Sequence, residues 1–192
     1  MSENQDNKKR EKEYTGLIHE AWEVVRILLI SLAIVLPIRY FIAQPFIVRG
    51  ASMEPAFENR EYLIIDELSY YFRTPLRGEV IVFRYPREPR QFFIKRIIAL
   101  PHEQIEIHNG RIKILNQEYP DGFILDESYL GPGYRATFPN ITISLSDDEY
   151  FVLGDNRNFS SDSRVWGALG KKFIIGRVLF RAWPVNRFGV VI

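Results

Sequence analysis

The chain has 192 residues, 46% of them hydrophobic and 14% aromatic, so it can bury one good core but is too short for two large domains. Its formal net charge of +1 gives no overall basic field that would hold nucleic acid, and we expect no nucleic-acid partner. It contains no cysteine, which excludes disulfides, thiolate chemistry and cysteine-based zinc sites but is compatible with either side of a membrane.

The beginning of the chain changes abruptly from polar to apolar. Residues 1–20 hold too little apolar surface to offset the entropy of ordering, and we expect a disordered cytoplasmic tail. Residues 21–45 are long and apolar enough for one transmembrane helix, with Arg26 and Arg39 near its ends, where long side chains reach the interface. Basic residues before the span predict a cytoplasmic N-terminus and an extracytoplasmic domain over residues 46–192.

Two other interpretations of this apolar segment are a cleaved signal peptide and a buried core helix. Cleavage prefers small residues one and three positions before the cut, whereas Phe41 and Ala43 would place a bulky side chain at the outer position. A core helix would show a polar stripe, but between Ile27 and Ile38 only Ser31 interrupts the apolar run. An uncleaved anchor is therefore the interpretation that we follow.

The rest of the chain is typical of a mostly β domain of antiparallel sheets. Short runs rich in β-branched and aromatic residues are separated by Gly, Pro and Asn. These runs cover residues 61–68, 78–85, 92–100, 104–115, 149–155 and 173–183. Asn109-Gly110 predicts a type I′ hairpin turn, and residues 69–72 predict a short helical turn. The end of the chain, residues 181–192, is interpreted mainly as a core strand, with Trp183 or Phe188 as interfacial contacts.

Three segments carry polar residues that demand an explanation. The first, residues 49–55, holds Ser52 between small residues and Pro55, although serine beside glycine is most often an ordinary turn residue. The second is the apolar run 92–100, in which Lys95 and Arg96 must point to opposite faces, so that one cation enters or borders the core. A desolvated lysine has a lowered pKa and can act as a general base, whereas an edge strand would use the same cations to discourage aggregation.

The third segment, residues 154–164, gathers two Asp, two Arg, two Asn and three Ser after a predicted strand. Such density indicates either a hydrogen-bonded structural loop or the wall of an active site. The residues alone leave both open.

In order and spacing the three segments resemble the motifs of the type I signal peptidases, the bacterial leader peptidase family of Ser-Lys serine proteases. The resemblance covers the apolar N-terminal segment and three boxes, which are Ser52, Met53 and Pro55; Lys95 and Arg96; and Gly154, Asp155, Asn156, Ser160, Asp162, Ser163 and Arg164. It implies a signal-peptidase-like β catalytic domain after one transmembrane helix, and a membrane-bound endopeptidase that removes N-terminal signal peptides from exported preproteins.

The resemblance also implies a role for each residue. Ser52 would be the nucleophile and Lys95 the general base, with Ser160 hydrogen-bonded to the amine of Lys95. The supporting residues would be Asp155 paired with Arg96, Asp162 and Arg164 as braces, and Gly154 and Asn156 within the same box. The backbone N–H of Ser52 would stabilise the oxyanion. Many relatives place a serine hydroxyl two positions before the nucleophile, but this chain has Gly50 there, so a backbone group or water must substitute.

The substrate implied by the resemblance is an extended stretch with small residues, as in Ala-x-Ala, at the first and third positions before the cut. The pocket lining carried over from the family is Val48, Met53, Phe57, Phe93 and Ile94. The expected partners are signal peptides, the lipid bilayer and, by proximity, the secretion translocon. The expected location is the plasma membrane in a single-pass arrangement.

Other chemistries are poorly supported. His19 lies in the N-terminal segment and His102 and His108 lie in or beside predicted turns, so a Ser-His-Asp triad lacks its base. No spacing indicates a metal site, and we expect no cofactor. The alternatives that remain are a self-cleaving repressor-type protease, which would need a DNA-binding domain, and a membrane-anchored β module that binds partners without catalysis.

Overall fold

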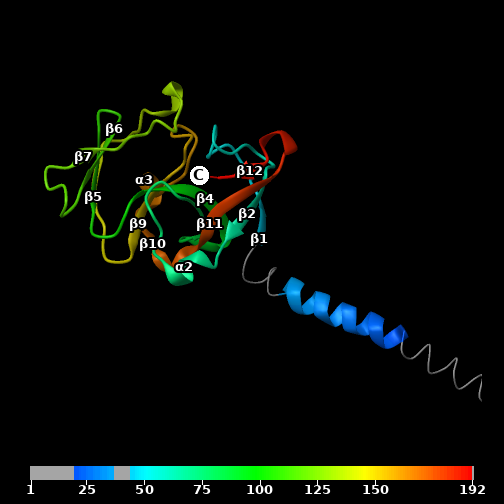
Figure 1. The fold of residues 1–192 in the computed structure, drawn as a ribbon. Coiled ribbons are helices and arrows are strands. Elements are labelled where there is room, and N and C mark those ends of the chain that lie inside the picture. The colour runs from blue at the N-terminus through cyan, green and yellow to red at the C-terminus, as the bar shows by residue number, and fades with distance from the viewer. Residues whose placement is uncertain (1–19, 37–43, 192) are drawn as a thin grey trace, which may run out of the picture. The chain divides into compact units, whose positions relative to one another are not determined.

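The computed structural model describes residues 20–36 and 44–191, and the chain divides into two units at residues 42 and 43. The described part of the first unit is a helix over residues 20–36, drawn in blue in Figure 1. Within the described residues, no helix combines the length and the apolar character that crossing a membrane requires. The predicted tail lies almost entirely outside the described residues, as does part of the predicted span over 21–45. The last residues of that span, Gln44 and Pro45, belong to a β-strand.

The second unit consists of antiparallel strands in two sheets, with a few short helices between them (Figure 1). The strands are β1 (Gln44–Ile47), β2 (Tyr62–Asp66), β3 (Val80–Tyr85), β4 (Glu88–Ala99), β5 (Gln104–His108), β6 (Arg111–Leu115), β7 (Phe123–Ile124), β8 (Ile141–Ser144), β9 (Glu149–Leu153), β10 (Leu169–Gly170), β11 (Ile174–Trp183) and β12 (Gly189–Val190). The helices are α2 (Ser69–Phe72), α3 (Ser163–Trp166) and the 3₁₀ turns η2 (Pro132–Tyr134), η3 (Lys171–Phe173) and η4 (Val185–Arg187). The mostly β, antiparallel fold predicted from the sequence is confirmed.

The larger sheet has the order β1-β2-β11-β3-β4-β9-β10, with β12 also paired to β11, and the smaller sheet has the order β7-β6-β5-β8. Every long run predicted as a strand forms one, including the hairpin β5–β6. Asn109 and Gly110 join these two strands with φ of 50° and 77°, which is why this pair of residues suits the turn. The helical turn predicted over residues 69–72 is α2.

Two apolar clusters hold the site in place. One packs β5 and β6 of the smaller sheet against β4 and β9 of the larger one. The other packs β2 and β3 against the loop that follows β1, in which Met53 and Phe57 are almost completely buried. Ile94 of β4 also packs against this second cluster. The loop after β1 and the middle of β4 are therefore fixed to the same core, although they are far apart in the sequence.

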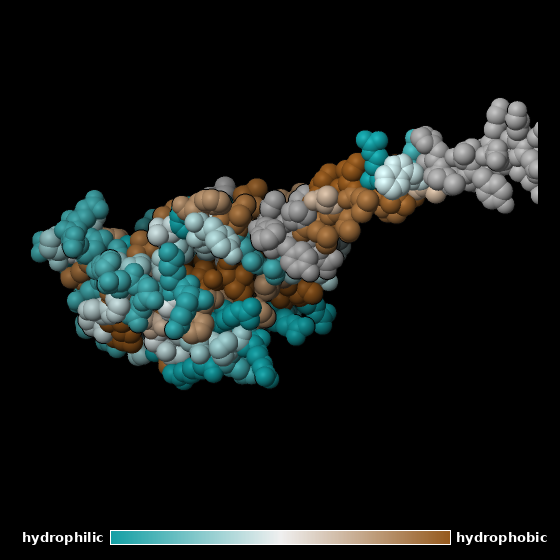
Figure 2. Space-filling model, turned by 90° about the horizontal axis from the view of Figure 1, so that it is seen from below, coloured by the Kyte–Doolittle hydropathy of each residue, from teal (hydrophilic) through white to brown (hydrophobic). Residues whose placement is uncertain are grey.

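Large apolar side chains also remain on the surface of the second unit. Trp183, the last residue of β11, and Phe188, in the segment after it, are exposed, and β12 pairs with β11. Residues 181–183 are in a strand, as predicted, but the prediction of a core strand is wrong, because none of the residues 181–191 is buried. Figure 2 shows apolar areas bordered by hydrophilic side chains on one face of the molecule.

Candidate active site

The loop after β1 presents Ser52. The start of this loop is fixed at Gly50, which has a φ of +93° and donates its N–H to Asn59 Oδ1 at 3.1 Å. After Ser52 the chain turns back, with a hydrogen bond of 2.8 Å from Phe57 N to Met53 O. The buried side chains of Met53 and Phe57 tie this turn to the core, so Ser52 is held on a packed loop.

Asn156 connects the loop that carries Ser52 to the loop after β9. Its backbone N–H donates to Ser52 O at 3.1 Å, and its side-chain amide donates to Ala51 O at 3.1 Å. The segment around residue 156 therefore holds the backbone on both sides of the bond between Ala51 and Ser52.

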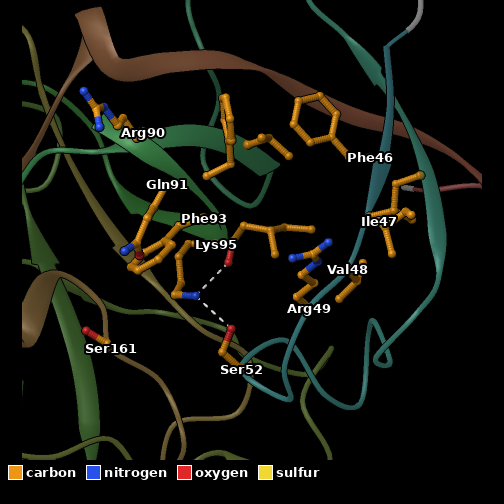
Figure 3. A pocket seen from close by; sticks show the side chains of 14 residues that line it. Phe46, Ile47, Val48, Arg49, Ser52, Arg90, Gln91, Phe93, Lys95 and Ser161 are labelled. Carbon is orange, nitrogen blue, oxygen red and sulfur yellow. Dashed lines mark hydrogen bonds between the residues drawn. The ribbon is translucent and has the colours of Figure 1, made fainter. Parts of the chain in front are cut away.

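Lys95 approaches the serine from the middle of β4. Its Nζ lies 2.8 Å from Ser52 Oγ and also donates to Ile94 O at 2.8 Å, as Figure 3 shows. Only 3% of Lys95 is exposed. Burial lowers its pKa from the usual 10.5 to about 8, while the negative charges of Asp162 and Asp155 raise it. With this pKa, a fraction of the amine is neutral near physiological pH, against almost none for an ordinary lysine. The neutral amine, in contact with a hydroxyl, can accept the proton of that hydroxyl.

The neighbour of Lys95 points to the other face of β4, as strand alternation requires. Arg96 forms a two-point ion pair with Asp155, with Nε–Oδ1 at 2.9 Å and Nη2–Oδ2 at 2.7 Å. The guanidinium also donates to Gly78 O at 2.8 Å and lies 4.3 Å from the centre of the Tyr129 ring. Both charges of this pair are thus satisfied in an almost completely buried position.

A second buried carboxylate organises the far end of the same loop. Asp162 accepts from the backbone N–H of Gly154 at 3.1 Å and from the guanidinium of Arg164 by two bonds of 2.8 Å. It also caps α3 by accepting from Arg164 N. Arg164 donates in addition to Phe138 O and Arg157 O at 2.8 Å each. These residues brace the loop without touching the serine hydroxyl.

Ser160 departs from its predicted role. Its Oγ is buried and has no hydrogen-bond partner, so the expected bond to Lys95 is not formed. The amine of Lys95 is instead occupied by Ser52 and by the carbonyl of Ile94. The Ser160 side chain packs so closely on Gly154 that a Cβ at that position would collide with it and with Ser52 O. The close packing of Ser160 is therefore one reason why position 154 requires glycine.

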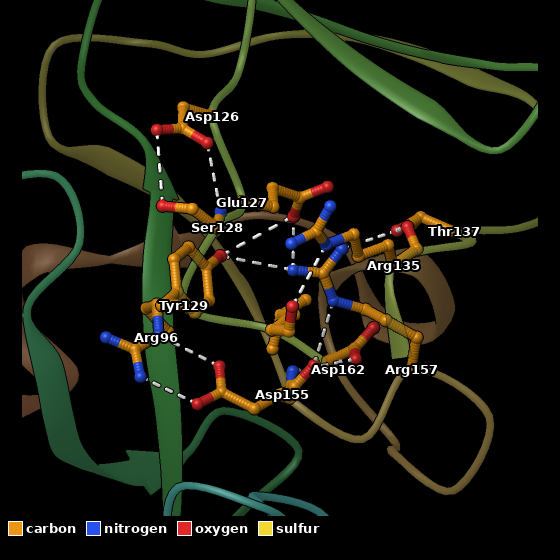
Figure 4. Close-up of polar contacts among 12 residues, drawn as sticks. Arg96, Asp126, Glu127, Ser128, Tyr129, Arg135, Thr137, Asp155, Arg157 and Asp162 are labelled. Carbon is orange, nitrogen blue, oxygen red and sulfur yellow. Dashed lines mark hydrogen bonds and ion pairs between the residues drawn. The ribbon is translucent and has the colours of Figure 1, made fainter. Parts of the chain in front are cut away.

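A buried network behind the loop was not predicted from the sequence (Figure 4). Arg157 donates to Gly154 O at 3.0 Å, to the Tyr129 hydroxyl at 3.2 Å, and to Thr137 and Glu127. Burial, the largest influence on Tyr129, raises its pKa to about 12, so its hydroxyl stays neutral. The network connects the loops of the smaller sheet to Gly154, whose backbone lies against Ser52 O. Its members come from three separate loops, which no local motif would bring together.

A cavity of about 620 Å³ opens beside the Ser52–Lys95 pair. Val48, Phe93 and Ile94, three of the five predicted pocket residues, line it. Met53 and Phe57 do not line it, because the turn after Ser52 directs both side chains into the core, where each is 1% exposed. The sequence interpretation missed Phe46, Leu63 and Val82 as apolar lining residues from β1, β2 and β3.

The other candidate chemistries find no support in the described part of the chain. His102 is exposed on the turn before β5, His108 is exposed at the end of β5, and His19 lies outside the described residues. Among the residues that the structure describes, no three His, Cys, Asp or Glu side chains are grouped to hold a metal ion.

Comparison with known proteins decides the family. The sequence pattern of the family described as signal peptidase, peptidase S26 matches residues 21–183. The chain belongs to this family. It is 36% identical to a probable signal peptidase I-1 of Synechocystis sp., over 90% of this chain and 89% of the relative. It is 32% identical to a signal peptidase I of Bacillus amyloliquefaciens, over 93% of this chain and 96% of the relative.

Among solved structures, a signal peptidase I from Enterococcus faecalis is 30% identical with a TM-score of 0.48, over 55% of this chain and 97% of that chain. Family membership confirms the resemblance drawn from the motifs. The protein is a signal peptidase and a hydrolase.

Proposed function

We propose that this protein is a membrane-anchored serine endopeptidase that removes N-terminal signal peptides from exported preproteins, with Ser52 as nucleophile and Lys95 as general base. The observation that carries the proposal is the 2.8 Å contact between Ser52 Oγ and a lysine amine that burial holds at a pKa of about 8. A serine hydroxyl is a poor nucleophile until a positioned base removes its proton, and this amine is such a base.

The reaction can be written with one proton carrier. As Ser52 Oγ attacks the scissile carbonyl carbon, its proton passes to Lys95 Nζ, and the carbonyl oxygen becomes the oxyanion. The C–N bond then breaks as the protonated amine donates to the leaving nitrogen, which leaves the signal peptide as an ester on Ser52. A water molecule attacks this ester, gives its proton to Lys95, and the proton returns to Ser52 Oγ as the bond breaks.

The backbone N–H of Ser52 supports the oxyanion. Among the hydrogen bonds of the described residues, none uses this N–H as donor, so it is free to donate to the developing charge. Gly50 has no hydroxyl to offer, and a second donor has to come from the backbone or from water.

The cavity supports selection of small residues. Val48, Phe93 and Ile94 form an apolar wall close to the catalytic pair. An extended substrate would place the side chains of its first and third residues before the cut against this wall, which favours alanine at both positions.

The anchor is proposed from the apolar run between Ile27 and Ile38, whose described side chains Ile27, Leu28 and Leu29 are more than half exposed in the helix over 20–36. The proposed arrangement has the N-terminus in the cytoplasm and the catalytic unit outside the plasma membrane, near the translocon. Resistance of the full-length protein to alkaline extraction would support it, and complete release would oppose it.

The test of the catalytic assignment is cleavage of a preprotein with an Ala-x-Ala site by the detergent-solubilised protein. We expect Ser52→Ala and Lys95→Ala to fold without cutting, while the surface controls Ser144→Ala and Lys172→Ala cut normally. If both site variants cut as the unaltered protein does, the three motifs are structural and an anchored binding module becomes the better description.

A further inference from the structure

The cavity beside the catalytic pair has an uneven charge. Its apolar floor is bordered by two arginines, Arg49 and Arg90, in addition to Lys95. None of its lining residues is Asp or Glu. Both arginines are exposed and belong to opposite parts of the lining, Arg49 to the segment after β1 and Arg90 to the first half of β4.

The positive charge of these two arginines is uncompensated. Within the described part of the chain, neither side chain forms an ion pair. By contrast, Arg96, Arg157 and Arg164, which support the site, are each paired with a carboxylate. The cavity therefore presents positive charge to whatever enters it.

The positions of the arginines relate them to different parts of an extended substrate. Arg49 lies three positions before Ser52 and lines the same cavity, so it would face substrate residues close to the cut. Arg90 lies five positions before Lys95 on β4, about 17 Å away along the strand at 3.3 Å per residue. In Figure 3 Arg49 lies on the side of Val48 and Ser52, and Arg90 at the end away from Ser52. An extended peptide lying along the cavity would reach Arg90 with a residue about five positions from the cut.

We propose that Arg49 and Arg90 are specificity-determining residues, which favour cleavage regions with an acidic side chain and disfavour those with Lys or Arg. The inference rests on the proposed function, because it assigns substrate chemistry to the same cavity. The apolar wall would still select small residues. The arginines would add a charge preference at substrate positions whose side chains do not contact this wall.

The test is a set of peptides with one Ala-x-Ala site, in which each position from six before the cut to three after it carries Glu, Gln or Lys in turn. Cleavage is measured as kcat/KM with the full-length protein in neutral detergent. The variants are Arg49→Glu and Arg90→Glu, and the control is Arg111→Glu, which makes the same charge change at the start of β6 in the other sheet.

For the unaltered protein, we expect Glu to exceed Lys in kcat/KM by about two- to fivefold at the position that faces each arginine, as for an exposed charge pair. Each variant should reverse the preference at its own position only, and Arg111→Glu should leave all preferences unchanged. The preference should weaken at 1 M salt, where the Debye length falls to about 3 Å.

Equal rates for Glu and Lys at every position would overturn the inference, as would a preference that survives both charge reversals. If peptide cleavage shows no preference while binding to anionic vesicles requires both arginines, the charges serve a lipid surface and the inference is wrong. Either outcome leaves the Ser-Lys assignment intact, because that is judged only by whether Ser52→Ala and Lys95→Ala cut.

Discussion

The buried amine of Lys95 carries a cost in stability that can be measured separately from catalysis. Methionine has a similar length and no charge, so Lys95→Met removes the amine without opening a large cavity. We expect this variant to be inactive and yet more stable than the unaltered protein at pH 7. Such a gain in stability is unusual, because most substitutions in a packed core destabilise the protein.

The magnitude follows from the pKa of Lys95. Its fall from 10.5 to about 8, at about 1.36 kcal/mol per unit, corresponds to roughly 3 kcal/mol against folding. The folded state binds fewer protons than the unfolded chain between these two pH values, so stability rises across the window with increasing pH. The penalty is complete below pH 8 and is gone above pH 10.5.

The assay is chemical denaturation of the full-length protein in detergent, followed by tryptophan fluorescence at pH 7 and at pH 10.5. The advantage of Lys95→Met should be up to about 3 kcal/mol at pH 7 and should vanish or reverse at pH 10.5, where the variant only loses the contacts of the amine. Lys172→Met, a change at an exposed lysine, serves as control and should show no such dependence. The reasoning would be refuted if Lys95→Met were less stable than the unaltered protein at pH 7, or if its free energy of unfolding differed by the same amount at both pH values.

Three further outcomes follow from the geometry. The kcat/KM of the unaltered protein should rise about tenfold per pH unit below pH 8 and level off above it. Asp162→Asn removes a charge that raises the pKa of Lys95, so the rising part of its pH profile should move to lower pH. An unchanged pH profile would contradict this electrostatic influence of Asp162 on Lys95. Gly154→Ala should lose most of its activity and about 1–3 kcal/mol of stability, because the added methyl group overpacks against the loop that carries Ser52. A methyl group at Gly133 would meet no atom within 4 Å, so Gly133→Ala should leave thermal denaturation unchanged. Phe93→Ala should broaden the residues accepted at the cleavage site, and unchanged selectivity in a peptide panel would remove Phe93 from the pocket wall.

The sequence predicted the elements whose cause is local. Alternating β-branched runs formed strands, and Asn109-Gly110 formed its turn because both residues tolerate positive φ. Lys95 also stood out, since strand alternation forces one of two adjacent cations toward the core. The resemblance to a family then associated it with Ser52, 43 positions away, and the structure brings the two side chains into contact.

What the sequence did not predict depends on which way a turn or loop directs its side chains. Met53 and Phe57 are close to Ser52 in sequence, but the turn between them directs both into the core. Arg157 and Glu127 meet across 30 positions, and neither belongs to a pattern that indicates its partner. Such contacts follow from the packing of two sheets, which periodicity along one strand does not describe.

The paired arginines explain how the pKa of a lysine can stay low close to two carboxylates. Asp155 and Asp162 would hold a nearby amine in its charged form if their charges were unopposed. Each is instead bound by two hydrogen bonds to a guanidinium, Arg96 for the first and Arg164 for the second. The combined field of each ion pair falls off faster than that of a lone charge, so burial remains the largest influence on Lys95. The arginines therefore limit how far the carboxylates that build the loop raise the pKa of Lys95, as the proposed role of a general base requires.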